Sequence, residues 1–562
     1  MSAASARGPA LLIRGATVLD GSGDDGARAD VLVEGGLVAA VGPGLASVPG
    51  SEVMDAEGLA LAPGFIDMHS HSDLYTLVQS DSGLRVGDDP KLLQGVTTQV
   101  FGQDGISMAP VGHGDVSDFA DFVAGLDGYL DPAAWTWRSF GEYLQALRER
   151  SATRVAGLVG HSTIRRLVMG MEARPPRPDE LEAMCAAVDR AMREGAIGLS
   201  TGLVYVPAAY ASTDEQVALA SVVASHRGRL FIHVRNESHL VLEATQEALE
   251  VARRSGVHLH YSHIKTAGQA NWHRVGQMLE MIDEYRRDGV VVTCDVHPYT
   301  AGSTTATVLL PPWLLEDGPQ AAVQQLASAE VRARVRLQLL EDVSSWDNWW
   351  VFSGGWDGLR IAWVAAGSPN AHFQGSSLGE VIAAAGVSEP LSPAGFDVLF
   401  DLLVAERLQM SLISFNNTEC NIARFMGQPY CSIGSDALVN PGGHPHPRLY
   451  GCFPRVLSSY VREQGILSLA EAVHAMTGRA AAAIGFPERG RIAVGAAADL
   501  VLFDPQVVSD LATYEDPRTP PTGISRVLVG GRTVVQAGRL VGPEMGRAAE
   551  EPLPEVAGGA RA

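Results

Sequence analysis

The sequence has few cysteines and few basic residues for its length. Its 562 residues include only five cysteines, and none of them lies in a C-x-x-C pair. Asp and Glu total 64 against 42 Lys and Arg, which gives a net charge of -22. Binding to a phosphate backbone needs clustered Lys and Arg. We therefore expect no nucleic-acid partner.

Long hydrophobic runs are also missing. No stretch approaches the length of a membrane span, and only three large apolar residues, 11–13, stand together before Arg14, too few for the core of a signal peptide. We therefore expect a cytoplasmic protein with no membrane partner, whose scattered cysteines are reduced and mostly buried. Residues 543–562, rich in Pro, Gly, Ala and Glu, have the composition of a disordered tail.

The two ends of the chain share one pattern. Residues 11–42 and 490–541 both contain short β-branched runs that are broken by Gly and Asp clusters, as is typical of strands and hairpins. Neither segment has enough apolar residues for a core of its own, and a chain of 562 residues is expected to form at least two domains. We predict one small β-sandwich built from residues 1–62 and 487–542.

Between these segments, candidate strands alternate with candidate helices. Apolar residues recur at helical spacing from 181 to 192 before Gly195, and a second helix is expected from the cap residue Ser238 to Gly256. Eight strands with helical intervals predict an α/β fold, a (β/α)8 TIM-type barrel over residues 63–311 and 394–486. The candidate strands are 64–71, 97–104, 154–161, 196–201, 230–233, 258–263, 290–295 and 431–436.

The connection between the seventh and eighth strands is longer than a barrel needs. Its middle, residues 312–393, combines a helical run with a cluster of tryptophans, so we predict an inserted, lid-like subdomain. The tryptophans either form the small core of this subdomain or contact a ligand. They are Trp346, Trp349, Trp350 and Trp356.

Two histidines follow an apolar run in the stretch FIDMHSHSD, residues 65–73. Side chains alternate along a strand, so His69 and His71 would project from the same face in a chelating arrangement. A His-x-His pair found alone is more often two solvated or satisfied histidines than a metal site. Other residues must therefore show whether this pair belongs to a metal site.

Further metal-binding residue types stand at the expected strand ends, which converge on one site in a barrel. Individually, His233 could be a core histidine, Asp104 a loop cap and Asp436 a helix cap, but these readings give no reason for them to coincide. Four histidines and two carboxylates match the ligands of a divalent transition metal. The predicted ligands are His69, His71, Asp104, His233, His263 and Asp436.

With these ligands the chain resembles a known family. The motifs VGHSTIRRLVMG (159–170), GLSTGLVYVPAAYAS (198–212), SHIKTAGQANW (262–272), CDVHPYTAGST (294–304), HPRLYGCFPRVL (446–457) and GRIAVGAAADLVLFDP (490–505) occur in order. Together they resemble the D-aminoacylase (N-acyl-D-amino-acid deacylase) family of the metal-dependent amidohydrolase superfamily. The resemblance covers nearly the whole chain except the tail and part of the inserted subdomain. It implies hydrolysis of a C–N amide bond, and a barrel flanked by a sandwich from both chain ends.

The resemblance also implies a role for each ligand. His233 and His263, with the residue after strand two, resemble a tightly held zinc site, whereas His69, His71 and Asp436 resemble a weaker second site. Asp436 further resembles the general base that activates a metal-bound water. A bound metal lowers the pKa of its water and polarises the scissile carbonyl, and a carboxylate can pass the proton to the leaving amine.

The substrate implied by the resemblance is a small amide that carries a carboxylate. Lys265 and Arg448 resemble the groups that hold this carboxylate, and Tyr205 is a candidate for the same pocket. Lys265 would face the pocket in a continued strand, although lysines are usually exposed, and Arg448 offers a bidentate fork. His161, at the end of the third strand, is either a pocket residue or a strand cap.

Two residues depart from the family pattern. The family usually has Cys in an Asn-Cys-Gly turn after strand two, whereas this turn reads Gln103-Asp104-Gly105. A carboxylate is harder than a thiolate, so zinc is the expected metal but Mn, Co or Fe stay open, and its two oxygens could bridge two ions. His297 stands where the family commonly has Tyr, as a ligand, a proton shuttle or a substrate contact.

We interpret the sequence as that of a metal-dependent hydrolase that deacylates N-acyl-D-amino acids. The alternative is a cyclic amide hydrolase of the hydantoin, dihydropyrimidine or lactam type. Many such enzymes carboxylate a lysine at the end of strand four, and the stretch IGLSTGL has none. A further alternative is a barrel that has lost catalysis and serves binding or assembly. The acyl group, the side chain, the stereochemical preference and a homo-oligomeric state are left open.

Overall fold

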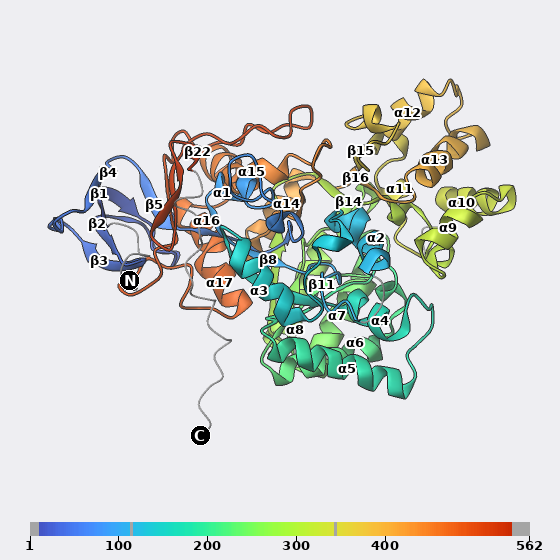
Figure 1. The fold of residues 1–562 in the computed structure, drawn as a ribbon, viewed down its shortest axis with the longest axis horizontal. Coiled ribbons are helices and arrows are strands. Elements are labelled where there is room, and N and C mark those ends of the chain that lie inside the picture. The colour runs from blue at the N-terminus through green and yellow to red at the C-terminus, as the bar shows by residue number, and fades with distance from the viewer. Residues whose placement is uncertain (1–9, 113–115, 342–344, 542–562) are drawn as a thin grey trace.

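The computed structural model describes residues 10–112, 116–341 and 345–541. The predicted tail, 543–562, lies outside the described residues. Figure 1 shows a sheet of blue and red strands from the two chain ends, a central barrel, and a group of yellow helices on the opposite side of the barrel.

A sheet of eight parallel strands forms the barrel, in the order β17-β13-β12-β11-β10-β9-β8-β6. Each predicted strand overlaps one of them, so the predicted (β/α)8 barrel is confirmed. Most of these strand residues are buried on both faces, as parallel sheets covered by helices require. The strands are β6 (Phe65–Asp67), β8 (Val96–Phe101), β9 (Arg154–Gly160), β10 (Gly198–Gly202), β11 (Arg229–His233), β12 (His258–Tyr261), β13 (Val292–Val296) and β17 (Cys431–Ile433).

The first and last strands meet through short contacts. The amide of Met68 donates to the carbonyl of Ile433 at 3.3 Å, and β7 (Ser70–His71) pairs in parallel with β18 (Ala437–Leu438). The predicted continuous strand 64–71 is therefore wrong in one detail. It breaks between β6 and β7, because the second part leaves the barrel sheet to pair with the segment after β17.

Helices cover the outside of the barrel (Figure 1). The predicted helix before Gly195 is α5, and the helix that ends at Gly256 is α7, whose cap Gly256 has φ +73°. The predicted cap Ser238 is wrong, because α7 begins at Val241 and the Ser238 hydroxyl donates to Asp347 at 2.5 Å. The helices are α1 (Asp89–Leu92), α2 (Val116–Asp127), α3 (Phe140–Arg150), α4 (His161–Met169), α5 (Pro178–Arg193), α6 (Thr213–Ser225), α7 (Val241–Ser255), α8 (Val275–Arg287), α14 (Glu419–Met426), α15 (Arg448–Arg455), α16 (Leu469–Met476) and α17 (Gly478–Ile484).

Both chain ends contribute to one mixed sheet. Its order is β22-β21-β20-β19-β5-β1-β2-β3, and β4 pairs with β1. The amide of Val38 in β3 also donates to the carbonyl of Ala496, just before β19, so the sheet folds back on itself around a small core. The strands are β1 (Leu11–Val18), β2 (Ala27–Glu34), β3 (Leu37–Gly42), β4 (Glu52–Asp55), β5 (Ala60–Pro63), β19 (Leu500–Phe503), β20 (Ile524–Val529), β21 (Arg532–Gln536) and β22 (Arg539–Leu540).

The segment between β13 and β17 carries structure of its own. Three antiparallel strands pair in the order β14-β16-β15, and two of them, β14 (Ala301–Thr305) and β16 (Met410–Phe415), lie outside the predicted insertion 312–393. Within the helical part, the ring of Trp350 packs against Trp356 and Phe396 at 5.4 and 5.9 Å between centroids. The other elements are β15 (Leu359–Val364), α9 (Pro319–Gln325), α10 (Ala329–Glu341), α11 (Trp349–Phe352), α12 (Leu378–Ala384) and α13 (Pro393–Ala405).

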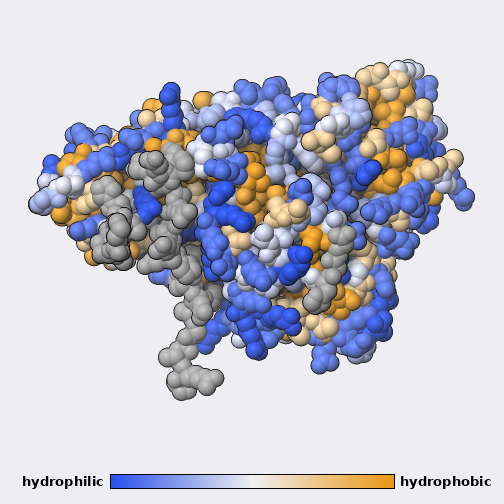
Figure 2. All heavy atoms as spheres, viewed as in Figure 1, coloured by the Kyte–Doolittle hydropathy of each residue, from blue (hydrophilic) through white to orange (hydrophobic). Residues whose placement is uncertain are grey.

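On the face drawn in Figure 2, hydrophobic residues form separate patches on a mostly hydrophilic surface. Among the described residues, none of the helices is both long and apolar enough to cross a membrane. All five cysteines are free thiols. Cys294, Cys431 and Cys452 are buried, Cys185 is half-buried, and Cys420 is exposed.

Candidate metal centre and active site

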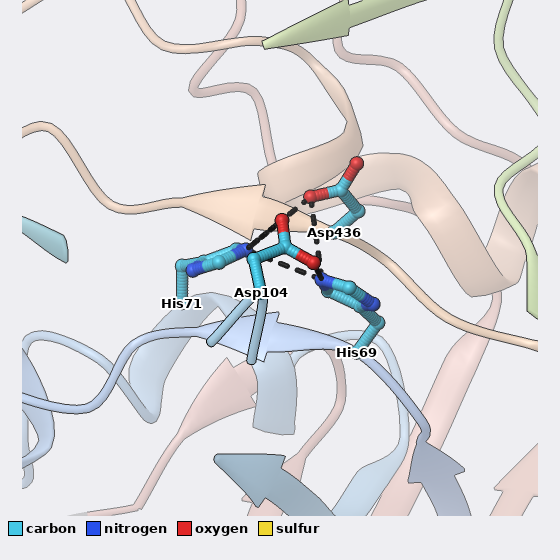
Figure 3. Close-up of side chains that lie close together, drawn as sticks. All are labelled: His69, His71, Asp104 and Asp436. Carbon is cyan, nitrogen blue, oxygen red and sulfur yellow. Dashed lines mark hydrogen bonds and ion pairs between the residues drawn. The ribbon is translucent and has the colours of Figure 1, made fainter. Parts of the chain in front are cut away.

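Four of the predicted ligands meet at the C-terminal end of the barrel. Figure 3 shows His69, His71, Asp104 and Asp436 pointing toward one another. The Nε2 atoms of the two histidines lie 3.2 Å apart. Oδ1 of Asp436 is 3.8 Å from Nε2 of His69 and 3.5 Å from Nε2 of His71. One ligand atom from each residue lies within 4.8 Å of the others, which suits a single cation.

Asp104 also belongs to a second group of ligands. Its Oδ2 lies 3.6 Å from Nδ1 of His233, and its Oδ1 lies 3.4 Å from Nε2 of His263. The two imidazole nitrogens that face it are 2.9 Å apart. The structure therefore brings all six predicted ligands together, in two groups that share Asp104.

Three of the six residues lie just beyond their strands in an unusual backbone conformation. Asp104, His263 and Asp436 have φ values of +53°, +33° and +51°. This left-handed region is uncommon for residues other than glycine, and such strain gathers at functional sites. The turn that each residue makes aims its side chain across the mouth of the barrel.

The donor set fits a divalent cation. All six side chains are buried, and Oδ1 of Asp104 has no hydrogen-bond donor among the described residues. Burial lowers the pKa of His69 to about 4, so this imidazole is neutral with a free lone pair near neutral pH. Burial and Lys265 lower the pKa of His263, but Asp104 and Glu237 raise it by more, to about 10. The site therefore attracts positive charge, and these residues can hold a metal ion.

Behind the ligands lie carboxylates that the sequence did not reveal. Oδ1 of Asp127, at the end of α2, accepts from Nδ1 of His71 at 2.8 Å. Asp295, in β13, accepts from Nε2 of His260 at 2.9 Å and from the backbone of His263 at 3.0 Å. Asp295 ends a predicted strand, which was a usable signal, whereas nothing in the sequence around Asp127 marks it.

Both predicted carboxylate-binding cations already have partners. Lys265 donates to Glu237 at 2.6 Å and lies 2.8 Å from Nδ1 of His263. Arg448, fully buried, donates to Oδ2 of Asp436 at 2.8 Å. Burial raises the pKa of Asp436, but Arg448 and the neighbouring histidines together lower it by more, so the pKa lies well below its ordinary value. The predicted continuation of strand six through Lys265 is wrong, because β12 ends at Tyr261.

The other three predicted substrate contacts differ in how many hydrogen-bond partners their side chains already have. Tyr205 packs edge-on against His233, with centroids 5.2 Å apart, and shares a 2.8 Å hydrogen bond with Thr304. Neither ring nitrogen of His297 has a hydrogen-bond partner among the described residues. Burial and then Arg448 lower the pKa of His297 well below its ordinary value, so the ring is neutral.

His161 has hydrogen-bond partners on both ring nitrogens. It begins α4 rather than ending a strand. Its Nδ1 is 2.9 Å from the hydroxyl of Thr201, and its Nε2 is 2.9 Å from Glu215. Both ring nitrogens are therefore occupied by the protein.

Comparisons with known proteins agree with this geometry. The family model described as the amidohydrolase family matches residues 52–535. The chain is 35% identical over 540 residues to D-aminoacylase of Alcaligenes xylosoxydans xylosoxydans, with 96% of each chain covered. This chain belongs to the D-aminoacylase group of the amidohydrolase family. It is therefore an amidohydrolase, an enzyme.

Two other relatives from the same organism have the same sequence identity. The chain is 35% identical to an N-acyl-D-aspartate deacylase, covering 93% of this chain and 91% of the relative, and 35% identical to an N-acyl-D-glutamate deacylase, covering 93% of each. Among solved structures, N-acyl-D-glutamate deacylase from Bordetella bronchiseptica, complexed with zinc and a phosphonate inhibitor, has a TM-score of 0.79 at 33% identity. That match covers 97% of this chain and 99% of the other.

Proposed function

We propose that this amidohydrolase removes the acyl group from N-acyl-D-amino acids. The observation that carries the proposal is the convergence of four histidines and two carboxylates at one end of the barrel, in two groups that share Asp104. Identity of 35% to three deacylases of N-acylated D-amino acids, over at least 93% of this chain, supports the same reaction.

The metal ligands in this proposal are those that the geometry groups. His233, His263 and Asp104 would hold one ion, and His69, His71 and Asp436 would hold a second with the help of Asp104. A divalent ion in such a site activates water for attack and polarises a carbonyl. Zinc suits the histidines, and the carboxylate of Asp104 also admits harder ions such as Mn, Co or Fe.

Asp436 is the proposed general base. Its Oδ1 faces the two histidines, while its Oδ2 is held by Arg448 at 2.8 Å. Arg448 therefore fixes the carboxylate and helps to keep it ionised, so that Oδ1, on the side of the metal ligands, can take a proton from the attacking water. The same oxygen then returns the proton to the leaving amine.

The substrate carboxylate has several candidate donors. Nε of Arg448 and both ring nitrogens of His297 are buried without partners among the described residues. Lys265 has fewer hydrogen-bond donors left for a substrate, since it already donates to Glu237 at 2.6 Å. We assign Arg448, His297 and Lys265 to the substrate, with Arg448 as the strongest carboxylate partner because its guanidinium stays charged. Tyr205 lines the same region, and the occupied nitrogens of His161 favour a supporting role for that residue.

A cyclic amide is the substrate in the competing hypothesis. The end of β10, residues 198–202, contains no lysine that could be carboxylated. The intact set of six ligands equally disfavours a barrel that only binds or assembles. Neither rival has an observation of its own in this structure.

The proposal is tested by metal content and hydrolysis on the same samples. Purified protein and Asp104→Ala are compared by elemental analysis, and both are assayed on N-acetyl-D-amino acids, their L-enantiomers and a set of hydantoins and dihydropyrimidines. We expect the native protein to hold metal and to cleave D-substrates, and the variant to lose both properties by at least about 100-fold. Cleavage of only the cyclic amides would support the rival, and absence of metal and of activity would support a binding protein.

A further inference from the structure

A cavity of about 140 Å³ adjoins the candidate metal centre. Tyr205 lines it, and the ring of Tyr205 packs edge-on against the metal-ligand candidate His233. The backbone of Leu203, also in the cavity wall, donates to the carbonyl of His233 at 3.0 Å. The cavity is therefore one side chain away from the place where the scissile amide must lie.

Most of the cavity wall is apolar. Ala, Val, Leu, Pro and Trp side chains make up the larger part, with Leu203 from the barrel and Val308, Leu315 and Trp346 from the segment between β13 and β17. Leu315 is only 5% exposed. A cavity of about 150 Å³ in an apolar core can hold a benzene ring. The size therefore suits a branched aliphatic group or a single ring.

The cavity wall offers no unpaired cation that could bind an acidic group of a substrate. Arg235 is the only basic residue among the described residues that line the cavity. Its guanidinium is held by both carboxylate oxygens of Glu247 at 3.0 Å and by the carbonyls of Ala209 and Ala211 at 2.8 Å. Asp347, the acidic member of the wall, adds negative charge when ionised and accepts from Ser238. A carboxylate in this cavity would lose its water without gaining a free counterion.

We infer that this cavity binds an uncharged, apolar group next to the scissile amide, so that the enzyme favours substrates with apolar groups over those with acidic side chains. The inference rests on the proposed deacylase function. Sequence identity does not show which side chains this enzyme prefers. The chain is 35% identical to D-aminoacylase, and also 35% identical to the N-acyl-D-aspartate and N-acyl-D-glutamate deacylases. Two groups of an N-acyl-D-amino acid flank the amide, the amino-acid side chain and the acyl chain, and we place the amino-acid side chain in the cavity.

Matched substrates test the inference on the native enzyme. N-Acetyl-D-leucine and N-acetyl-D-aspartate have side chains of similar shape and differ in charge, and N-acetyl-D-asparagine is polar but neutral. We expect kcat/KM for the leucine compound to exceed that for the aspartate compound by about 100-fold or more, since a buried carboxylate without a partner is costly. Lengthening the acyl chain on D-alanine from acetyl to hexanoyl forms a second series. We expect kcat/KM to change less than about tenfold along this acyl series, because the acyl chain lies outside the cavity; a rise of about tenfold or more would place the acyl chain in the cavity and overturn the assignment of the side chain.

Three variants connect the preference to the cavity. Leu315→Arg places a cation in the wall, and we expect it to narrow the leucine-to-aspartate ratio by about tenfold or more. Leu337→Arg is the matched control, because Leu337 is 46% exposed on α10 and outside the cavity wall; it should keep the native ratio. Trp346→Ala enlarges the cavity and should move the preference toward larger apolar side chains, such as the indole of tryptophan.

The outcomes separate this inference from the proposed function. Cleavage of the aspartate or glutamate compounds as fast as the leucine compound overturns the inference and leaves the deacylase function standing. If no N-acyl-D-amino acid is cleaved, the deacylase function fails. In that case, calorimetry of the binding of free D-leucine and D-aspartate tests the preference of the cavity separately from catalysis. Tighter binding of D-leucine supports the inference, and equal or tighter binding of D-aspartate overturns it.

Discussion

A single carboxylate behind the ligands determines how His71 faces the candidate metal centre. Nδ1 of His71 is held by Asp127 at 2.8 Å, and Nδ1 of His69 lies 3.9 Å from Oδ2 of Asp295. An imidazole that donates through one nitrogen presents a lone pair on the other. The Nε2 atoms of His69 and His71 both face inward, 3.2 Å apart. Asp127 thus selects the tautomer of His71 that a metal ion needs.

Replacing Asp127 should weaken metal binding without removing a ligand. We expect Asp127→Ala to lower the affinity for zinc about 10- to 100-fold, because His71 loses its orienting acceptor. Titration of metal-free protein against a chelating indicator measures this directly. Asp118→Ala, at an exposed position of the same helix, is the control and should bind zinc like the native protein. Equal affinity in the Asp127 and Asp118 variants would contradict an orienting role.

A histidine at the other end of the barrel should make folding sensitive to acid. Burial, with the nearby charges of Arg229, His260 and Arg286, lowers the pKa of His258 to about 3. An unfolded histidine has a pKa of about 6.5. The unfolded chain therefore binds the extra proton more readily, so this stabilisation is complete above about pH 6.5 and is lost as the pH falls toward 3.

The loss between pH 7 and pH 5 is at most about 2 kcal/mol for this group. His258→Gln, which stays neutral, should therefore show a smaller fall in the free energy of unfolding between these pH values than the native protein. Urea denaturation at both pH values measures the difference. His273→Gln, at an exposed histidine, should keep the native pH dependence. A larger acid sensitivity in the His258 variant would reverse the sign and disprove the assignment.

At the scale of elements, sharp turns after the barrel strands position the candidate metal ligands. β8 ends at Phe101 and the chain turns through Gly102 before Asp104, and β17 ends at Ile433 before Asp436. Gly102 has φ +76°, and a Cβ atom there would lie 2.1 Å from the carbonyl oxygen of Leu158 in β9. Only glycine therefore allows the two neighbouring strands to approach at this point.

Two glycines with similar backbone angles separate the cost of the angle from the cost of the clash. Gly256 has φ +73°, but nothing lies within 4 Å of a Cβ atom placed there. Gly256→Ala should cost about 1–2 kcal/mol of stability. Gly102→Ala should cost at least about 3 kcal/mol, because the clash with Leu158 is added, and should lower the metal content by moving Asp104. Chemical denaturation and elemental analysis of both variants test this, and similar losses of stability would show that the clash is relieved cheaply.

The elements were more predictable than their junctions. The alternation of candidate strands with candidate helices marked all eight barrel strands, and the helical period marked α5, because burial on one face of a helix leaves a periodic trace. The role of Ser238 could not be read, since its hydroxyl binds Asp347, more than a hundred residues away. The side chains of His69 and His233 could be grouped from strand ends, whereas Asp127 sits at the end of a helix after an irregular loop, where no periodicity marks its direction.

At the scale of the molecule, β19 joins the sheet from the chain ends to the barrel. Its alternate side chains serve two cores: Leu500 and Leu502 belong to the small core of the end sheet, while Val501 and Phe503 belong to the large core of the barrel. Phe65 of β6 packs against Phe503, with centroids 6.3 Å apart. The similar composition of the two chain ends predicted their association. Composition could not predict which strands pair, because β19 pairs with β5 and these two strands come from opposite ends of the sequence.

This shared strand should make the end sheet and the barrel unfold together. Leu502→Ala removes apolar volume only from the small core, and Phe503→Ala removes it only from the large core, with expected losses of about 2–5 and 3–5 kcal/mol. Because both side chains stand on one strand, each variant should shift a single unfolding transition to lower temperature, observed by calorimetry and by tryptophan fluorescence. All nine tryptophans lie between residues 135 and 363, outside the end sheet, so their fluorescence follows the barrel and the insertion. If Leu502→Ala instead produced a separate early calorimetric transition with unchanged fluorescence, the end sheet would be an independent unit, and the coupling through β19 would be too weak to make the molecule cooperative.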